Sequence, residues 1–274
     1  MHDRSRDLRG DLRRLECEHG GRLGVAILDT ANTESIAYRG DERFAMCSTF
    51  KFLAAAFVLA RVDRKRESLT RRVIFGEDCL VPYSPITEKR SGAPGMTIGE
   101  ICDSALTFSD NTAGNLLLDS FGGPMELTAF IRTLGDAVTR CDRREPELNE
   151  VRPGDPRDTT TPLAMLELVR EIVLGDVLVP SSREQMIRWL LANETGDRRL
   201  RAAAPQGWKV GDKTGTNGIT SSDANNATND IAVIWPPARA PIIVSAYYVE
   251  TGAAYDERES VLAEIGRLAI SKTR

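Results

Sequence analysis

The pattern of apolar and polar residues predicts strands near both ends of the chain and helices between them. Leucines recur at helical spacing between Arg4 and His19, and the glycine pair at 20–21 ends that amphipathic helix. Apolar runs bounded by turn residues predict strands at 23–28, 35–38, 208–216, 230–235 and 242–249. Helical periodicity predicts further helices at 47–59, 97–106, 113–120, 124–134, 162–174, 182–192 and 257–271.

This order of elements predicts an α/β (α+β) fold, an antiparallel sheet flanked by the terminal helices plus an all-helical lobe. The sheet lobe would be discontinuous, formed by residues 1–44 and 200–274, and residues 45–199 would form the helical lobe. Crossings near residues 45 and 199 would place a cleft beside Ser48. Clefts between lobes are a preferred location for small-molecule sites.

One segment does not fit either pattern. Prolines at 146, 153 and 156 exclude a long regular element between residues 143 and 162. A loop of about twenty residues is long for a compact domain, and such loops tend to be functional or disordered.

Composition and charge narrow the classes of function. The chain has 274 residues, of which 41% are hydrophobic and 28% charged, which is typical of a soluble globular protein. Its net charge of −4 gives no electrostatic reason to expect nucleic acid or an anionic membrane as partner. No apolar run approaches the ~20 residues that span a bilayer.

The histidines and cysteines exclude further chemistry. The only histidines are His2 and His19, outside any metal-binding spacing, so a His-rich zinc centre and a Ser-His-Asp triad are both excluded as interpretations. Any serine chemistry therefore needs another base. The cysteine count is 5, an odd number without zinc or redox spacing, so at least one thiol is free within the chain.

A candidate nucleophile begins the Ala-rich stretch 47–59. Helical spacing places Lys51 beside Ser48 on one face. A buried lysine has a lowered pKa or is tied into hydrogen bonds, and a nearby amine can accept the proton of a serine hydroxyl. The alternative is a Ser48 N-cap on a core helix whose lysine reaches water.

Three further stretches carry polar groups that suit a site. Ser109-Asp110-Asn111 places a hydroxyl and an amide in a turn, or else forms a helix cap. Glu145 to Asn149 lies in the long loop, or else is a solvated acidic turn. In Lys213-Thr214-Gly215, strand alternation sends Lys213 and Gly215 to one face, and a glycine there lets a ligand approach the backbone, unless the strand simply ends at a turn.

Together, in this order, Ser-x-x-Lys, Ser-Asp-Asn, Glu-Pro-Glu-Leu-Asn and Lys-Thr-Gly form the motif set of penicillin-recognising serine enzymes. The chain resembles the class A β-lactamases from its first predicted strand to its last predicted helix. The resemblance implies hydrolysis of the β-lactam ring of antibiotics through an acyl-enzyme, with no cofactor and no metal.

The resemblance also implies catalytic roles. Ser48 would attack the β-lactam carbonyl, and the N–H groups of Ser48 and Thr216 would form the oxyanion hole. Lys51 and Glu145, the latter through a water, are rival candidates for the acylation base. Ser109 would relay a proton to the leaving nitrogen, assisted by Lys213. The deacylating water would be held by Glu145 and Asn149.

Substrate contacts follow from the same resemblance. Asn111 would bind the acylamino carbonyl and Tyr83 would form a wall of the cleft. The substrate carboxylate needs a cationic, hydroxyl-rich receptor. Thr214 and Thr216 suit this receptor, and Gly215 between them would also bind the substrate. Many relatives carry an arginine where this chain has Thr228, and Arg199 matches the alternative source of the guanidinium.

Structural features of the family are expected around the long loop. Arg143 and Asp158 match the ion pair that closes it, and the Glu145-Pro146 peptide bond is cis in the family. The segment 217–228 is longer and more polar than the usual hairpin, which leaves the substrate range open.

The resemblance also bears on disulfide bonds. Cys47 and Cys102 match halves of two family disulfides, but Asn217 and Ala55 stand at the partner positions. We therefore expect neither bridge.

The expected partner is a small-molecule β-lactam, with no nucleic acid and no membrane. The resemblance implies a monomer in the periplasm or secreted, from which a signal peptide has been removed. One alternative is a penicillin-binding peptidase or transpeptidase, which lacks the water-activating glutamate; Glu145 and Asn149 argue against it. The other is a non-turnover β-lactam sensor, which needs a membrane segment or extra domain to report binding.

Overall fold

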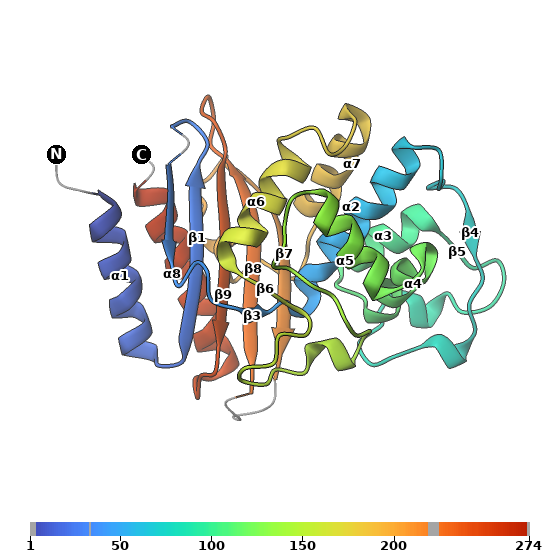
Figure 1. Cartoon of the computed structure of the whole chain (residues 1–274), viewed down its shortest axis with the longest axis horizontal. Helices are drawn as coiled ribbons and strands as arrows, with labels where there is room; N and C mark the ends of the chain where they lie inside the picture. Colours follow the sequence, from blue (N-terminus) through green and yellow to red (C-terminus); the bar gives the residue numbers. More distant parts are fainter. Residues whose placement is uncertain (1–3, 33, 219–224, 273–274) are drawn as a thin grey trace.

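The structure, a computed structural model, describes residues 4–32, 34–218 and 225–272 of the chain. A five-stranded antiparallel sheet runs through the molecule in the order β2-β1-β9-β8-β7, with helices on both faces (Figure 1). The α/β fold predicted from the sequence is confirmed.

The sheet joins strands from the two ends of the chain. Its N-terminal strands are β1 (Arg22–Asp29) and β2 (Glu34–Tyr38). Its C-terminal strands are β7 (Lys209–Asn217), β8 (Ala227–Trp235) and β9 (Ile242–Val249). Strand β1 pairs with β9, so the sheet closes only when the two ends of the chain meet. Strand β7 forms one edge of the sheet, and it carries the Lys-Thr-Gly motif.

The terminal helices cover one face of the sheet. Helix α1 (Arg4–His19) packs beside α8 (Tyr255–Lys272), and α8 contacts β8 and β9 (Figure 1). The leucines that predicted α1 are buried in this layer, at positions 8, 12 and 15. The apolar stripe of each helix is thereby removed from water, which is the main stabilising contribution of an amphipathic helix.

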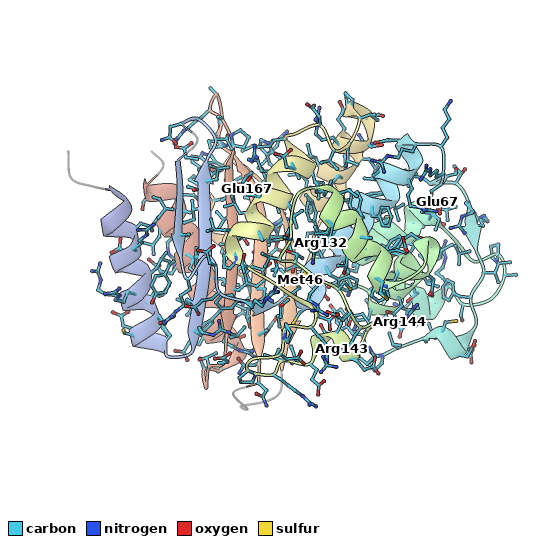
Figure 2. All side chains as sticks on the ribbon, viewed as in Figure 1. Met46, Glu67, Arg132, Arg143, Arg144 and Glu167 are labelled. Atoms are coloured by element: carbon cyan, nitrogen blue, oxygen red, sulfur yellow. The ribbon has the colours of Figure 1, made fainter. Side chains whose placement is uncertain are left out.

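The other helices lie on the opposite face and beyond the β7 edge (Figure 1). Helix α2 (Phe50–Asp63) is apolar on nearly all sides and is buried among its neighbours, as expected for a core helix. The surrounding helices are α3 (Ile98–Thr107), α4 (Asn111–Phe121), α5 (Pro124–Thr133), α6 (Pro162–Val173) and α7 (Pro180–Leu191). Side chains fill the space on both sides of the sheet (Figure 2).

Short elements escaped the sequence analysis because two or three residues carry no periodicity. Strand β3 (Phe44–Ala45) pairs with β6 (Thr159–Thr160), and β4 (Arg72–Val73) pairs with β5 (Met96–Thr97). The 3₁₀ turns are η1 (Cys47–Thr49), η2 (Glu77–Cys79), η3 (Thr87–Lys89), η4 (Glu147–Asn149) and η5 (Leu200–Ala203). The β3–β6 pair matters most, because it fastens the end of the long loop beside the start of α2.

The start of the Ser48 helix differs from the prediction. Residues 47–59 were expected to form one helix, but Cys47 to Thr49 form η1 and the α-helix begins at Phe50. Cys47 has φ of 46°, a left-handed conformation that is strained for a side chain with a Cβ. Ser48 therefore lies in a tight turn and is not an N-cap.

The strands that flank the segment 217–228 extend further into it than predicted. Strands β7 and β8 stay paired as far as Asn217 and Ala227. Residues 219–224 lie outside the described part of the chain. No helix within the described ranges is long and apolar enough to cross a membrane.

Candidate active site

A cleft of about 270 Å³ lies where the end of β7 faces η1, the start of α4 and the long loop. Its walls carry hydroxyl, amide and guanidinium groups with two tyrosine rings. The lining residues are Ser48, Tyr83, Ser109, Asn111, Asn149, Thr195, Arg199, Thr214, Thr216, Asn217, Gly218 and Tyr255. All four motifs of the sequence contribute a residue to this lining, and Glu145 lies behind it, bonded to Asn149.

Ser48 and Lys51 are in direct contact. The Lys51 Nζ donates to Ser48 Oγ at 2.8 Å, to the Ser109 carbonyl at 2.8 Å and to Asn111 Oδ1 at 2.7 Å. Burial lowers the pKa of Lys51, while the nearby Glu145 carboxylate opposes that shift. A lysine with a lowered pKa loses its proton more readily, so it can act as a base toward the hydroxyl.

Glu145 completes the group around the hydroxyl. Its Oε1 lies 3.0 Å from Lys51 Nζ and 3.4 Å from Ser48 Oγ, and both ion-pair partners are fully buried. Its Oε2 accepts a hydrogen bond from the Asn149 amide. Ser48 thus has two possible proton acceptors within reach.

Asn115 fixes the backbone of Glu145. The Glu145 N–H donates to Asn115 Oδ1 at 2.9 Å, and Asn115 Nδ2 donates to the Glu145 carbonyl at 2.9 Å. The sequence analysis missed Asn115. Its only signal is an amide four residues after Asn111, on the same face of α4.

The loop that carries Glu145 is closed as the resemblance predicted. Arg143 Nε lies 2.6 Å from Asp158 Oδ2, and the Glu145-Pro146 peptide bond is cis. The other oxygen of Asp158 accepts the backbone N–H groups of residues 142 and 143 at 2.7 and 2.9 Å. Arg143 and Arg144 are labelled in Figure 2. The Asp158 carbonyl also accepts the Met46 N–H at 2.9 Å, which ties the loop to the residue before η1.

Ser109 and Lys213 form a second hydroxyl–amine pair. The Lys213 Nζ donates to Ser109 Oγ at 2.9 Å and to the Thr214 carbonyl at 2.8 Å. Burial, reinforced by the charge of Lys51, places the pKa of Lys213 well below its usual range. Two buried amines therefore lie behind the cleft, each bonded to a serine hydroxyl that lines it.

The three residues of the Ser-Asp-Asn motif have different roles. Asp110 is the N-cap of α4 and accepts the Ala113 N–H at 2.8 Å, and it also binds Thr87. The cap interpretation therefore holds for Asp110, while Ser109 and Asn111 face the cleft. Asn111 Nδ2 donates to the Pro82 carbonyl at 2.8 Å, and the next residue, Tyr83, is 58% exposed at the rim.

The structure gives a packing reason for a glycine at position 215. A Cβ on Gly215 would lie 2.6 Å from the Met46 carbonyl oxygen and 3.2 Å from Thr49 Cγ2. The chain's own backbone just before Ser48 makes a close approach that requires glycine here. Gly215 lets β7 lie directly against η1.

Arg199 lies beneath the cleft, with 1% of its surface exposed. Its Nη2 donates to Thr216 Oγ1 at 2.7 Å and to the Tyr255 hydroxyl at 3.0 Å. Thr214 Oγ1 lies 2.5 Å from Thr195 Oγ1. Thr228 is paired with Thr216 across β7 and β8, so the position matched to an arginine in many relatives faces this region without a charge.

Taken together, the cleft and the side chains buried behind it bring together two serine hydroxyls each bonded to an amine, one carboxylate, and a guanidinium bonded to two hydroxyls. The sequence model of the β-lactamase enzyme family matches residues 7–273. The chain is 47% identical over 254 residues to β-lactamase OXY-2 of Klebsiella oxytoca, covering 93% of this chain and 85% of that protein. The chain belongs to the class A β-lactamases.

Solved structures of class A β-lactamases have the same fold as this β-lactamase over nearly the whole chain. The ancestral GNCA class A β-lactamase is 59% identical, with TM-score 0.92, covering 96% of this chain and 99% of that chain. The putative class A β-lactamase PenP from Rhodopseudomonas palustris is 55% identical, with TM-score 0.93, covering 97% of this chain and 99% of that chain. The protein is a β-lactam hydrolase, an activity that confers antibiotic resistance.

The five cysteines of this β-lactamase are all free thiols, including Cys47 and Cys102. Burial raises the pKa of both these thiols above their usual range, which makes them poor nucleophiles. Within the described ranges, no group of three or more His, Cys, Asp or Glu side chains could hold a metal ion.

The sequence analysis also missed part of the cleft wall of the β-lactamase. Thr195 follows α7, Gly218 follows β7, and Tyr255 is the first residue of α8. None of them belongs to a motif. They reach the cleft only because the sheet brings the start of α8 beside the end of β7.

Proposed function

We propose that this β-lactamase works through a Ser48 acyl-enzyme that is hydrolysed by a water activated by Glu145. The observation that carries the proposal is the contact of one hydroxyl with two bases: Ser48 Oγ meets both Lys51 Nζ and Glu145 Oε1 in a buried position. A serine hydroxyl is a weak nucleophile until such a base accepts its proton.

In the acylation step, a bond forms between Ser48 Oγ and the β-lactam carbonyl carbon, and the ring C–N bond breaks. The hydroxyl proton passes to Lys51 or, through a water, to Glu145. The N–H groups of Ser48 and Thr216 stabilise the oxyanion. Ser109 delivers a proton to the leaving nitrogen, and Lys213 makes that delivery easier because it binds Ser109 Oγ.

In the deacylation step, Glu145 accepts a proton from a water that attacks the ester. Asn149 supports this role because its amide binds Glu145 Oε2. The hydroxyl of Ser48 is restored when the ester bond breaks. A neighbouring carboxylate is suited to this work because its Oε1 lies 3.4 Å from Ser48 Oγ, the oxygen that carries the ester.

Substrate is held by groups on both sides of Ser48. Asn111 binds the acylamino carbonyl and Tyr83 stacks as a wall. Thr214, Gly215 and Thr216 on β7 flank the ring. Arg199 supplies the positive charge that attracts the substrate carboxylate.

Three wider features belong to the same proposal. Residues 1–44 and 200–274 form one lobe and residues 45–199 the other, with the cleft between them. The enzyme acts as a monomer, without nucleic acid as partner. Its location is periplasmic or extracellular. These features follow from the family resemblance and from the order of elements along the chain.

Nitrocefin hydrolysis by the wild type and by Glu145→Ala, with mass spectrometry of each protein after mixing, tests the mechanism. We expect steady turnover by the wild type and a stable adduct on Ser48 in the variant. Glu147→Ala is a matched control, because Glu147 lies two residues along the same loop and is exposed. It should turn over as the wild type does.

Other outcomes would identify the alternatives. One equivalent of adduct without turnover in the wild type would indicate a penicillin-binding peptidase or a sensor. Unchanged turnover by Glu145→Ala would contradict the role of Glu145. An absence of adduct in both proteins would contradict Ser48 acylation altogether.

A further inference from the structure

The guanidinium of Arg199 has no donor left for a substrate. Arginine carries five N–H groups. Nε binds Glu259 at 3.2 Å, and Nη1 binds the carbonyls of Gly215 at 3.2 Å and Asn229 at 2.8 Å. Nη2 binds the hydroxyls of Thr216 and Tyr255. A substrate carboxylate could bind this guanidinium directly only by displacing one of these partners.

Two of the five acceptors are hydroxyls that line the cleft. When a hydroxyl oxygen accepts from Arg199, its own hydrogen must point elsewhere. Within the described residues, neither Thr216 Oγ1 nor the Tyr255 hydroxyl donates to another group of the chain. Both hydrogens are therefore free to point into the cleft, where a carboxylate oxygen would accept them.

The third hydroxyl nearby, Thr214, is differently placed. Asn193 donates its amide to Asp212 at 2.6 Å, which turns Asn193 Oδ1 toward Thr195. Thr195 Oγ1 donates to that oxygen at 2.8 Å, so the short contact between Thr195 and Thr214 is donated by Thr214. The one hydrogen of Thr214 is used inside the protein.

Tyr255 is held rigidly enough to act as a ligand. Two guanidinium groups lie near its ring, with the Cζ atoms of Arg199 and Arg258 at 5.9 Å and 5.4 Å from the ring centroid. Arg258 in turn donates to the carbonyls of Asn217 at 3.3 Å and Gly218 at 2.6 Å. The ring, the end of β7 and the start of α8 thus form one connected wall.

We propose that the hydroxyl of Tyr255 is a further direct ligand of the substrate carboxylate, beside the Thr216 hydroxyl already placed in this receptor, and that Arg199 acts through it. This inference rests on the proposed function of the cleft. The positive charge polarises both O–H groups and keeps their hydrogens directed at the substrate. Tyr255 is thereby a substrate-binding residue that contributes to selection for anionic β-lactams.

The test compares benzylpenicillin with its methyl ester, which lacks the negative charge. Tyr255→Phe keeps the ring near both guanidinium groups and removes only the hydroxyl. We expect the ratio of kcat/KM for the acid to kcat/KM for the ester to fall roughly tenfold or more, the loss typical of a hydrogen bond to a charged group. The loss should lie in KM, with kcat for the acid within about twofold.

The matched control is Tyr38→Phe. Tyr38 lies on β2, and its hydroxyl donates to Glu16 far from the cleft. This variant should keep the acid-to-ester ratio of the wild type. A purely structural effect of Tyr255→Phe would lower kcat/KM for both substrates equally and leave the ratio unchanged, which would overturn the inference.

A second measurement does not depend on whether Tyr255→Phe folds. A crystal structure of the benzylpenicillin acyl-enzyme, trapped with Glu145→Gln, should place a carboxylate oxygen about 2.7 Å from the Tyr255 hydroxyl. A carboxylate bonded directly to the Arg199 guanidinium, with Tyr255 out of reach, would overturn the inference. If no acyl-enzyme forms although the wild type is folded, the proposed function fails. Normal turnover with an unchanged ratio leaves that function intact and removes only the role of Tyr255.

Discussion

Asn229 joins the sheet to the nucleophile turn through the carbonyl of Met46. Its side-chain Nδ2, on β8, donates to the Met46 oxygen at 3.2 Å and to the Ala45 oxygen at 2.9 Å. The Asn229 carbonyl accepts from Arg199 on the other side. One residue thus lies between the cationic receptor and the turn that positions Ser48, so its amide should affect catalysis without touching substrate.

Asn229→Asp tests this relationship with almost no change of shape. The new carboxylate would face two carbonyl oxygens, acceptor against acceptor, and we expect the free energy of unfolding to fall by about 2–3 kcal/mol. We expect kcat for nitrocefin to fall with it, because Ser48 loses its fixed position. Urea unfolding and steady-state kinetics measure the two effects.

The same variant has a pH signature. Burial raises the pKa of a carboxyl group, and in the protonated form it can again donate to one of the two carbonyls. A group whose pKa is raised in the folded state adds stability at low pH and loses it as the pH rises. The deficit of Asn229→Asp should therefore shrink below about pH 5. A deficit independent of pH would contradict the donor role.

Gly215→Ala should separate β7 from η1. The added Cβ would lie 2.6 Å from the Met46 oxygen, and backbone cannot move aside as a flexible side chain does. We expect a loss of about 1–3 kcal/mol in the free energy of unfolding, typical of overpacking, together with a large fall in kcat. Gly252→Ala is the matched control, since nothing lies within 4 Å of the Cβ it would add. Wild-type kcat in Gly215→Ala would show that the contact is not needed.

The sequence predicted the regular elements well because each is long enough to show its periodicity. Helix α1 was predicted at its observed bounds, and the capping box of Thr97 and Glu100 marked the start of α3 correctly. The β3–β6 pair could not be predicted, since two residues carry no period and their pairing depends on the closed loop.

The site was predictable where function requires a residue type at a fixed spacing. Lys51 follows Ser48 by three residues, a spacing that brings the two side chains together across the junction of η1 and α2. Tyr255 and Asn229 belong to no such pattern, because their partners are distant along the chain. The reason for Gly215 was also out of reach, since only the packed structure shows which backbone approaches it.

Arg143→Ala tests the closure of the Glu145 loop. It removes the partner of Asp158, whose carboxylate is almost fully buried, and breaking such a pair costs about 3 kcal/mol. Glu145 would lose its fixed position, so deacylation should slow more than acylation and the Ser48 adduct should accumulate. Stopped-flow kinetics with quenched mass spectrometry measures the two steps.

Arg157→Ala provides the control on the same loop. Its partner Asp155 forms an exposed pair, and exposed pairs contribute little to stability. The variant should keep both the stability and the adduct lifetime of the wild type. Equal effects of the two substitutions would indicate general loosening of the loop, and not the loss of the Arg143–Asp158 pair.

The pH dependence of stability in Lys213→Met tests whether burial disfavours the charged form of Lys213. Because the pKa of Lys213 lies well below its value of about 10.4 in the unfolded chain, the unfolded chain binds more protons between these two values. The free energy of unfolding of the wild type therefore rises with pH across that window, by up to about 1.4 kcal/mol per pH unit from this group. Lys213→Met lacks this contribution, so its stability relative to the wild type should be highest at low pH and decline as the pH rises. Urea unfolding at pH 6, 7.5 and 9 measures this relative stability. If the stability of Lys213→Met relative to the wild type rose with pH instead, the buried lysine would be stabilised in its charged form.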